Sequence, residues 1–388
     1  METIDLDALH MVVGGDALAR EASGRVVFVS GAIAGETVRV TLTMAKKDFA
    51  RATVDEVLVA SPDRVTPRCE AWHRGCGGCD WQHIAPAAQL SHKTAIVTEA
   101  LTRTARVANP LVTAAGSVEP WGYRTTIRLA RSRRGVGFRS RHSHDVVPIS
   151  ECPVSAPAVN AVLAATDNTD GRAGDLTIRV SVATGATSTT HSADLIEEDV
   201  AGRQLRVSIG SFFQSSPQAA ELLVAAVGRA LVDIDLPSSL VIDAYGGIGL
   251  FAATAAAVAR EVVLIEGSAA ACADARHNLS GRNATVVNSR VEEWTPIEAD
   301  VVIADPARAG LDRDAVAVLV ATRASRLVLV SCDTGSLARD TKLLVASGYE
   351  HRWTEVIDAF PNTSHIETVT RYDRLDSARP ELDQIGSG

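Results

Sequence analysis

The six cysteines are the residues of this sequence whose type and spacing best suit chemistry. A reducing compartment disfavours disulfide frameworks, so metal binding and catalysis are the first uses to consider in a chain of 388 residues. Their spacing is uneven, with members at Cys69, Cys76, Cys79, Cys152, Cys272 and Cys332. We therefore expect more than one role among them.

The first cysteines form a cluster. Cys76 and Cys79 are separated by two glycines, a step short enough to give two ligands to one centre. Together with Cys69 and Cys152 they supply four thiolates, and this spacing alone allows either zinc or an iron-sulfur cluster. Cys272 has no comparable partner and is interpreted as a core residue of a helix.

Cys332 stands in a different setting, directly after a hydrophobic strand expected at residues 327–330. Ligands of parallel α/β sheets bind at the carboxyl ends of strands, so this is a position suited to function. A free cysteine is more often an inert buried thiol. The polar turn at 333–336 and Arg339, about one helical turn further on, favour a thiolate instead, because a thiolate needs a polar and electropositive setting.

A glycine-rich turn between an expected strand and helix, within residues 240–251, forms a candidate cofactor site. Three expected strands end in an acid, at Asp243, Glu266 and Asp305, and Glu266 is placed to accept the hydroxyls of a ribose. The turn lacks the three-glycine spacing of dinucleotide enzymes. A dinucleotide site stays possible, but S-adenosylmethionine fits better.

The order of expected elements predicts an α/β protein with a doubly wound, Rossmann-like sheet in its last part. Short strands at 26–29, 37–42 and 52–58 predict a small N-terminal β-barrel, and mixed patterns predict an α+β middle domain. The third part alternates strands and helices. Its expected strands are 240–243, 262–266 and 301–305, and its expected helices are 250–259 and 268–279. We place the domains at 1–62, 63–210 and 211–388, with a polar tail from about Ser377.

Composition limits the partners and the location. A hydrophobic content of 46% suits a globular protein. No stretch approaches the roughly 20 apolar residues of a membrane helix, and the first residues are acidic, so we expect a cytoplasmic monomer that does not contact membranes. The net charge of −9 argues against nucleic-acid binding through overall charge. Residues 121–144, however, carry seven arginines and no acid, which gives a local surface for phosphates.

Several motifs together resemble the RNA uracil-C5 methyltransferases, the family that makes 5-methyluridine in tRNA and ribosomal RNA. The cysteine motif is 331–340 (SCDTGSLARD), preceded by 305–310 (DPARAG) and followed by 360–367 (FPNTSHIE). Phe212-Phe213-Gln214 is similar to the family's cofactor-binding Phe-x-Gln. The resemblance extends to the N-terminal residues 5–60, which look like the family's TRAM barrel.

The resemblance implies a covalent mechanism. Cys332 would be the thiolate that adds to carbon 6 of uracil, so that carbon 5 becomes nucleophilic enough to take the methyl group. Glu367 matches the family's general base. Gln214, Tyr245, Glu266 and Asp305 match its cofactor contacts. Leu250, where a polar residue is common, and Ser216, where an Asn is common, depart from the pattern.

The resemblance also concerns the cysteine cluster and the RNA. Cys69, Cys76, Cys79 and Cys152, near Trp81-Gln82-His83, look like the family's [4Fe-4S] segment, which favours that cluster over zinc. Arg124 is expected to contact RNA. A non-catalytic RNA-binding or assembly protein with a degenerate methyltransferase domain is the main alternative, followed by another methyl acceptor and by a DNA substrate.

Overall fold

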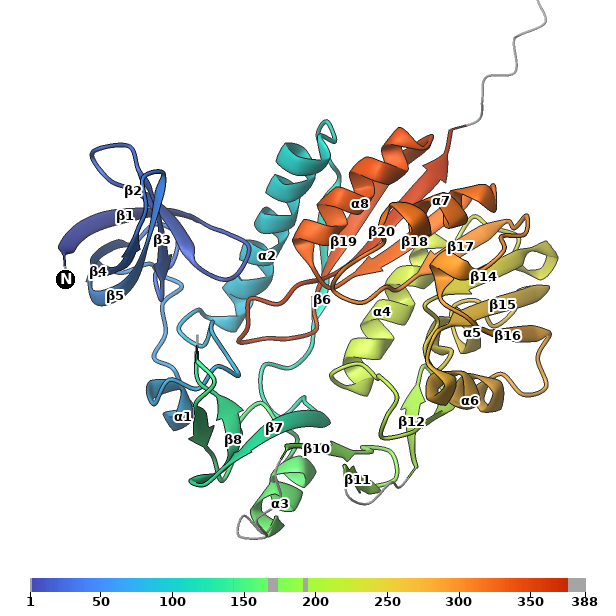
Figure 1. Cartoon of the computed structure of the whole chain (residues 1–388), viewed down its shortest axis with the longest axis horizontal. Coiled ribbons are helices and arrows are strands. Elements are labelled where there is room, and N and C mark those ends of the chain that lie inside the picture. The colour runs from blue at the N-terminus through green and yellow to red at the C-terminus, as the bar shows by residue number, and fades with distance from the viewer. Residues whose placement is uncertain (1, 142, 167–173, 191–194, 376–388) are drawn as a thin grey trace, which may run out of the picture.

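The computed structural model describes residues 2–141, 143–166, 174–190 and 195–375, and the expected polar tail lies outside them. Figure 1 shows a barrel at one end of the molecule, a large sheet with helices at the other, and a smaller sheet beside them. Along the described part of the chain, no helix is both long and apolar enough to cross a membrane.

The N-terminal strands form a closed barrel, as the sequence predicted. Alternate residues point inward, and Val27, Val29, Val38 and Val40 are fully buried, which is the period of two that a half-buried strand requires. The barrel order is β1-β2-β3-β5-β4, with β1 at Thr3–Met11, β2 at Ala17–Arg20, β3 at Val26–Ser30, β4 at Thr37–Ala45 and β5 at Phe49–Val59.

The middle of the chain forms an antiparallel sheet in the order β11-β10-β7-β8-β9 and a separate hairpin, β12-β13. These strands are β7 at Thr126–Ser132, β8 at Gly135–Arg139, β9 at Val146–Pro148, β10 at Asp175–Val180, β11 at Thr187–Thr189, β12 at Ile196–Val200 and β13 at Arg203–Val207. Two helices belong to this part, α1 at Glu70–His73 and α3 at Pro157–Ala165.

The C-terminal part is built on an eight-stranded sheet with the order β16-β15-β14-β17-β18-β20-β19-β6. The first five strands are parallel, whereas β20 runs antiparallel between β18 and β19. The bounds are β14 Leu240–Ala244, β15 Glu261–Glu266, β16 Ala284–Asn288, β17 Val301–Ala304, β18 Arg326–Ser331, β19 Tyr349–Asp358, β20 Glu367–Arg374 and β6 Val112–Ser117. The strand β6 belongs to this sheet although it comes from the expected middle domain. The division of the chain at residues 63 and 210 stays a prediction.

Helices cover both faces of this sheet, so its strands are apolar on both sides. Successive residues of a strand face opposite sides of the sheet. Val241 packs on the face that α4 covers, and Ile242 packs on the face that α8 covers. On the first face lie α4 (Pro217–Ala230), α5 (Leu250–Ala253) and α6 (Ala269–Asn278); on the second lie α2 (Pro86–Ala100), α7 (Arg313–Ala321) and α8 (Thr334–Ala346). The Rossmann-like expectation is confirmed.

The expected helix at 250–259 is wrong in length, because α5 ends at Ala253. Thr254 leaves the helical conformation, with φ −120° and ψ −87°. The turns that follow are fixed from another element, since the guanidinium of Arg282 donates to the carbonyl of Ala257 at 2.8 Å. A tertiary contact thus overrides the helix propensity of an alanine-rich segment.

The chain order reverses its direction of travel across the sheet at β14. From β14 the chain adds β15 and β16 on one side and then β17 and β18 on the other. In open α/β sheets, ligands bind outside the carboxyl ends of the strands at such a reversal. The strand-end acids and the cysteine after β18 all belong to this edge.

Candidate active site and cysteine pocket

The glycine-rich turn after β14 needs glycine for close packing. A Cβ on Gly246 would lie 2.5 Å from Cγ of Leu264 and 3.1 Å from Cγ of Asp243. Neither neighbour is the free end of a flexible chain, so the turn tolerates no side chain here. The backbone therefore lies directly on β15 and close to any ligand held at this edge.

Two carboxylates accept hydrogen bonds from the backbone of this turn and of the residues that follow it. Asp243 is buried and accepts the N–H of Ala252 at 3.1 Å, while its other oxygen has no protein partner. Glu266 accepts the N–H of Gly247 at 3.0 Å and that of Ser268 at 2.6 Å. These backbone bonds fix the direction of the Glu266 carboxylate and leave lone pairs for ribose hydroxyls.

Tyr245 has an acidic hydrogen-bond partner that was not predicted from the sequence. Its backbone is left-handed, with φ 57°, and its hydroxyl donates to Glu292 at 2.8 Å. Glu292 follows β16, a half-exposed strand that was not recognised from the sequence. Glu292 lies in a short 3-10 helix at Val291–Glu293, four residues after the end of the strand, so the rule that located Glu266 at a strand end does not find it.

The remaining expected cofactor residues lie at the same edge. The backbone N–H of Asp305 donates to the carbonyl of Ala244 at 3.2 Å, which holds the ends of β17 and β14 together. Gln214 is buried, and the next residue, Ser215, donates to the carbonyl of Ala359 at 2.8 Å. Segments far apart in sequence are thus joined at this edge of the sheet.

Cys332 lies between the end of β18 and the N-terminus of α8, where a helix dipole favours negative charge. Asp333 caps this helix by accepting the N–H of Ser336 at 2.7 Å. The expected role of Arg339 beside the thiol is wrong, because its guanidinium binds Asp340 at 2.7 Å. Arg308 is the nearby cation that favours the thiolate, against the burial that raises the pKa of Cys332.

Glu367 is brought to Cys332 by strand pairing. Ser331 pairs with Thr368 across β18 and β20, so Cys332 follows the last pair on one strand and Glu367 precedes it on the other. Burial, the Glu367 carboxylate and Asp305 together raise the pKa of Cys332 to about 12. The two expected catalytic side chains therefore interact electrostatically.

Burial also raises the pKa values of the acids at this edge. The pKa of Glu367 rises to about 8 through burial and Asp305, and that of Asp305 to about 7 through burial and Asp243. Burial, with Glu266 adding to it, raises the pKa of Asp243 to about 7. A bound cation would offset these shifts, because an opposite charge favours the ionised form of an acid. This group of acids thus suits a positively charged sulfonium.

The arginine-rich segment is only partly a free basic surface. Arg128 and Arg139 both pair with Asp175, at 2.9 and 3.5 Å. Arg124 is directed inward and lies over the rings of Tyr123 and Phe360, 5.9 and 5.5 Å from their centroids. The expectation that Arg124 contacts RNA stays untested, and its visible contacts are with the protein.

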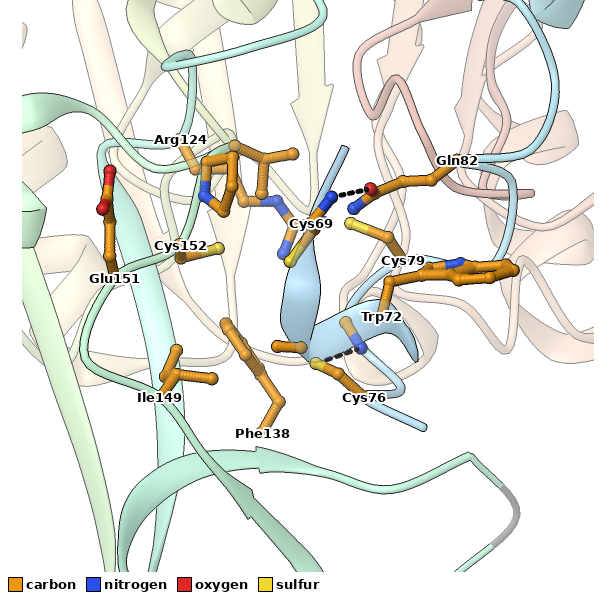
Figure 2. Close-up of a pocket in the computed structure, with 14 residues that line it drawn as sticks. Cys69, Trp72, Cys76, Cys79, Gln82, Arg124, Phe138, Ile149, Glu151 and Cys152 are labelled. Atoms are coloured by element: carbon orange, nitrogen blue, oxygen red, sulfur yellow. Dashed lines mark hydrogen bonds between the residues drawn. The ribbon is translucent and has the colours of Figure 1, made fainter. Parts of the chain in front are cut away.

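Four buried cysteines line one pocket, as Figure 2 shows. Cys69, Cys76 and Cys79 come from the segment around α1, and Cys152 comes from the loop after β9. Burial is the main cause that raises the pKa of Cys76, and the thiols of Cys152 and Cys69 add to it. The pKa of Cys79 rises to about 12, again chiefly through burial.

The lining of the pocket is largely apolar. Within the described residues, no group of three or more Cys, His, Asp or Glu side chains is placed to hold a metal ion. Thiolates on one zinc lie roughly 4 Å apart, because each Zn–S bond is about 2.3 Å long. A cluster holds its ligands further apart, on separate irons. The walls of the pocket include the apolar side chains of Trp72, Phe138 and Ile149.

Cys272 lies elsewhere, as expected of a core residue. It is fully buried in α6, and its thiol donates to the carbonyl of Glu266 at 3.2 Å.

Comparisons with known proteins agree on one family. Residues 291–374 match the model of the tRNA (uracil-5-)-methyltransferase family. A relative from Salmonella typhimurium, a 23S rRNA (uracil(1939)-C(5))-methyltransferase, is 31% identical over 96% of this chain and 95% of its own. An uncharacterized RNA methyltransferase from Streptomyces avermitilis is 33% identical, over 92% of this chain and 94% of its own.

A solved structure shares the whole fold. The Pyrococcus abyssi tRNA (uracil-54, C5)-methyltransferase, in complex with S-adenosyl-L-homocysteine, aligns with a TM-score of 0.73 at 21% sequence identity. The alignment covers 95% of this chain and all of that one. At this identity the alignment shows a shared overall fold.

Proposed function

The chain belongs to the RNA uracil-C5 methyltransferases, which are S-adenosylmethionine-dependent enzymes, and we propose that it methylates uracil through a covalent adduct on Cys332. The observation that carries the mechanism is the pairing of Ser331 with Thr368. This pairing brings a cysteine and a buried carboxylate together at the ligand-binding edge of the sheet. A thiol and a base are the two groups that the chemistry needs.

Cys332 supplies the nucleophile. Its thiolate forms a bond to carbon 6 of uracil, and the electron pair of the C5–C6 double bond moves toward carbon 5 and the carbonyl oxygen. Carbon 5 would then take the electrophilic methyl group that S-adenosylmethionine carries on its sulfonium, and S-adenosylhomocysteine would leave with the electron pair of the broken S–CH3 bond. Arg308 and the N-terminus of α8 favour the thiolate, and they oppose the burial that raises its pKa.

Glu367 completes the reaction as the general base. After methyl transfer, carbon 5 carries both a methyl group and a hydrogen. The Glu367 carboxylate takes this proton, the C5–C6 double bond forms again, and the bond from carbon 6 to Cys332 breaks to return the thiolate. Burial of Glu367 raises its pKa to about 8, which makes the carboxylate a stronger base than an exposed one.

The cofactor is held by the residues around the glycine-rich turn. We assign Glu266 to the ribose hydroxyls, with Gln214, Tyr245 and Asp305 as further contacts. The orientation of the Glu266 carboxylate by Gly247 and Ser268 supports this assignment. The family often has a polar residue at the position of Leu250. Because the leucine side chain offers no hydrogen bond, the turn would contact the cofactor through its backbone groups.

The substrate class is a structured RNA, and we favour ribosomal RNA over tRNA. The relatives that support this choice are named as 23S rRNA methyltransferases and match nearly the whole chain, at 30–31% identity. The N-terminal barrel would bind RNA in the manner of a TRAM domain. Intact Cys332, Glu367, Asp305 and Gln214 disfavour a non-catalytic assembly protein.

For the cysteine pocket we propose a [4Fe-4S] cluster held by Cys69, Cys76, Cys79 and Cys152. Four buried thiols in one apolar pocket support it, since four thiolates are the usual complement of such a cluster. When bound, the cluster would fix two segments distant in sequence. The backbone N–H of Gly78, which donates to Sγ of Cys76 at 3.4 Å, would stabilise a thiolate there.

Nucleoside analysis tests the function. Purified protein is incubated with labelled S-adenosylmethionine and unmodified ribosomal RNA or tRNA, and the labelled nucleoside is identified by mass spectrometry. The proposal expects 5-methyluridine, predominantly in ribosomal RNA. Label on another base alone would contradict it, and labelled uridine only in tRNA would leave the reaction and change the substrate.

A further inference from the structure

The loop between β19 and β20 delivers Glu367 to the site, and it is fastened by side chains from outside its sheet. The ammonium of Lys93, in α2, donates to Asp358 at 2.6 Å and to the carbonyl of Phe360 at 3.3 Å. Gln89, one turn earlier, accepts the N–H of Asn362 at 2.6 Å. The first half of the loop is thus fixed to α2.

The second half of the loop is held by a different segment, residues 80 and 81. The carboxylate of Asp80 accepts the N–H of Ser364 at 2.8 Å, three residues before Glu367. The backbone N–H of Trp81 donates to the carbonyl of Asn362 at 3.0 Å. Asp80 thus fastens the loop three residues before Glu367, and beyond it the side chain of His365 has its Nε2 3.5 Å from the guanidinium of Arg308.

The barrel encloses this contact from the other side. The indole N–H of Trp81 donates to the carbonyl of Gly15 at 2.9 Å, in the turn between β1 and β2. A Cβ on Gly15 would lie 2.6 Å from Oδ2 of Asp80 and 2.9 Å from Cβ of Ser364. The barrel turn, Asp80 and the loop are therefore packed in van der Waals contact.

We propose that Asp80 is a positioning residue for Glu367: by holding Ser364 against the barrel turn, it sets the carboxylate of Glu367 for removal of the proton from carbon 5. This inference rests on the proposed function of Glu367 as the base. Neither the chemistry of the cofactor site nor the position of Cys332 depends on Asp80. Its loss therefore acts on one step, the release of product from the covalent adduct.

The first test replaces Asp80 and compares two variants. Asp80→Ala removes the acceptor, whereas Asp80→Asn keeps an amide oxygen able to accept the Ser364 N–H. In single-turnover reactions with labelled cofactor, we expect Asp80→Ala to slow product release by roughly tenfold to a hundredfold, the scale of a small misplacement of a reacting group. A methylated protein–RNA adduct should accumulate on a denaturing gel, and Asp80→Asn should restore release.

A second pair of variants is independent of the cysteine beside Asp80. Gly14 and Gly15 have nearly the same left-handed backbone, φ +93° and +92°, but a Cβ on Gly14 meets nothing within 4 Å. Gly14→Ala and Gly15→Ala thus carry similar backbone strain, and only Gly15→Ala pushes on Asp80 and Ser364. We expect adduct accumulation with Gly15→Ala alone, at a cofactor KM equal to that of Gly14→Ala.

Glu367→Gln run in parallel separates the two hypotheses. If Glu367→Gln accumulates the adduct but Asp80→Ala and Gly15→Ala release product at the wild-type rate, the positioning role is wrong and the base assignment stands. The same conclusion follows if both variants lose methyl transfer without any adduct. If Glu367→Gln itself forms no adduct, the proposed mechanism fails first. Iron content is measured for every variant. In the case where Asp80→Ala loses iron, the result for Gly15→Ala decides whether the positioning role is correct.

Discussion

Ser331 and Thr368 are directly paired across β18 and β20, and the hydroxyl of Thr368 donates to the carbonyl of Ser331 at 3.1 Å. The pairing places Cys332 and Glu367 next to each other, although 34 residues separate them in the sequence. Strand register is strongly fixed in a sheet that is buried on both faces, because a slip of one residue reverses every side chain. The geometry of the site is therefore a consequence of the fold.

The raised pKa of Glu367 predicts a pH-dependent stability. The pKa of the folded state, about 8, lies above the usual value of 4.5, so the carboxyl stabilises the fold while it is protonated. This contribution is lost as pH rises from about 4.5 to 8. Glu367→Gln removes the ionisation, and it should be more stable than the wild type at pH 8, on the order of a few kcal/mol. At pH 5 the difference should be small.

Thermal unfolding at pH 5 and pH 8 measures this effect. Glu298→Gln is the matched control, because the Glu298 side chain is 78% exposed and its ion pair with Arg323 lies at the surface. An equal change in Tm for Glu367→Gln at both pH values would show that Glu367 is not buried as described.

Much of this arrangement could be predicted from the sequence, because its signals are local. The barrel follows from alternation, and the large sheet follows from strands that are apolar on both faces. Glu266 and Asp305 were found because an acid at the end of such a strand points to the ligand edge. Cys332 was found by the same rule, and its role and that of Glu367 came from the family resemblance.

Other features depend on contacts that no local pattern encodes. The contact of Asp80 with Ser364 joins residues 284 positions apart. Arg339 has the right spacing to reach the thiol, but the adjacent Asp340 binds it instead. Arg124 resembles a surface cation in sequence, yet it lies against Tyr123 and Phe360. In each case the partner is decided by tertiary packing.

The buried pair of Lys93 and Asp358 predicts a large loss of stability on mutation. Both side chains are essentially inaccessible, 0% and 1% exposed, and their charged atoms lie 2.6 Å apart. Lys93→Met leaves an unpaired buried carboxylate and should cost about 3–5 kcal/mol, whereas adding Asp358→Leu should recover much of this loss. Urea denaturation measures both.

An exposed ion pair gives the control for this comparison. Arg323 and Glu298 lie 3.2 Å apart, with side chains 68% and 78% exposed, so Arg323→Met should cost less than about 1 kcal/mol. A double variant of Lys93 and Asp358 no more stable than Lys93→Met would mean that the cost arises from packing and not from the unpaired charge.

The cysteine pocket predicts the metal content. Protein prepared without oxygen should be brown and hold about four irons per chain, because a [4Fe-4S] cluster has four irons on four thiolates. Cys79→Ala should lose most of this iron, while Cys272→Ala, which alters a buried thiol outside the pocket, should keep it. Metal analysis and the visible absorption spectrum decide, and one zinc without iron would contradict the cluster.

The most direct test of covalent catalysis is the protein–RNA adduct of Glu367→Gln. Removal of the base should slow product release by about a hundredfold or more while addition and methyl transfer continue. A denaturing gel with labelled cofactor should therefore show a labelled, shifted band for Glu367→Gln and none for the double variant with Cys332→Ala. If the double variant still formed the labelled adduct, the nucleophile would not be Cys332 and the proposed mechanism would be wrong.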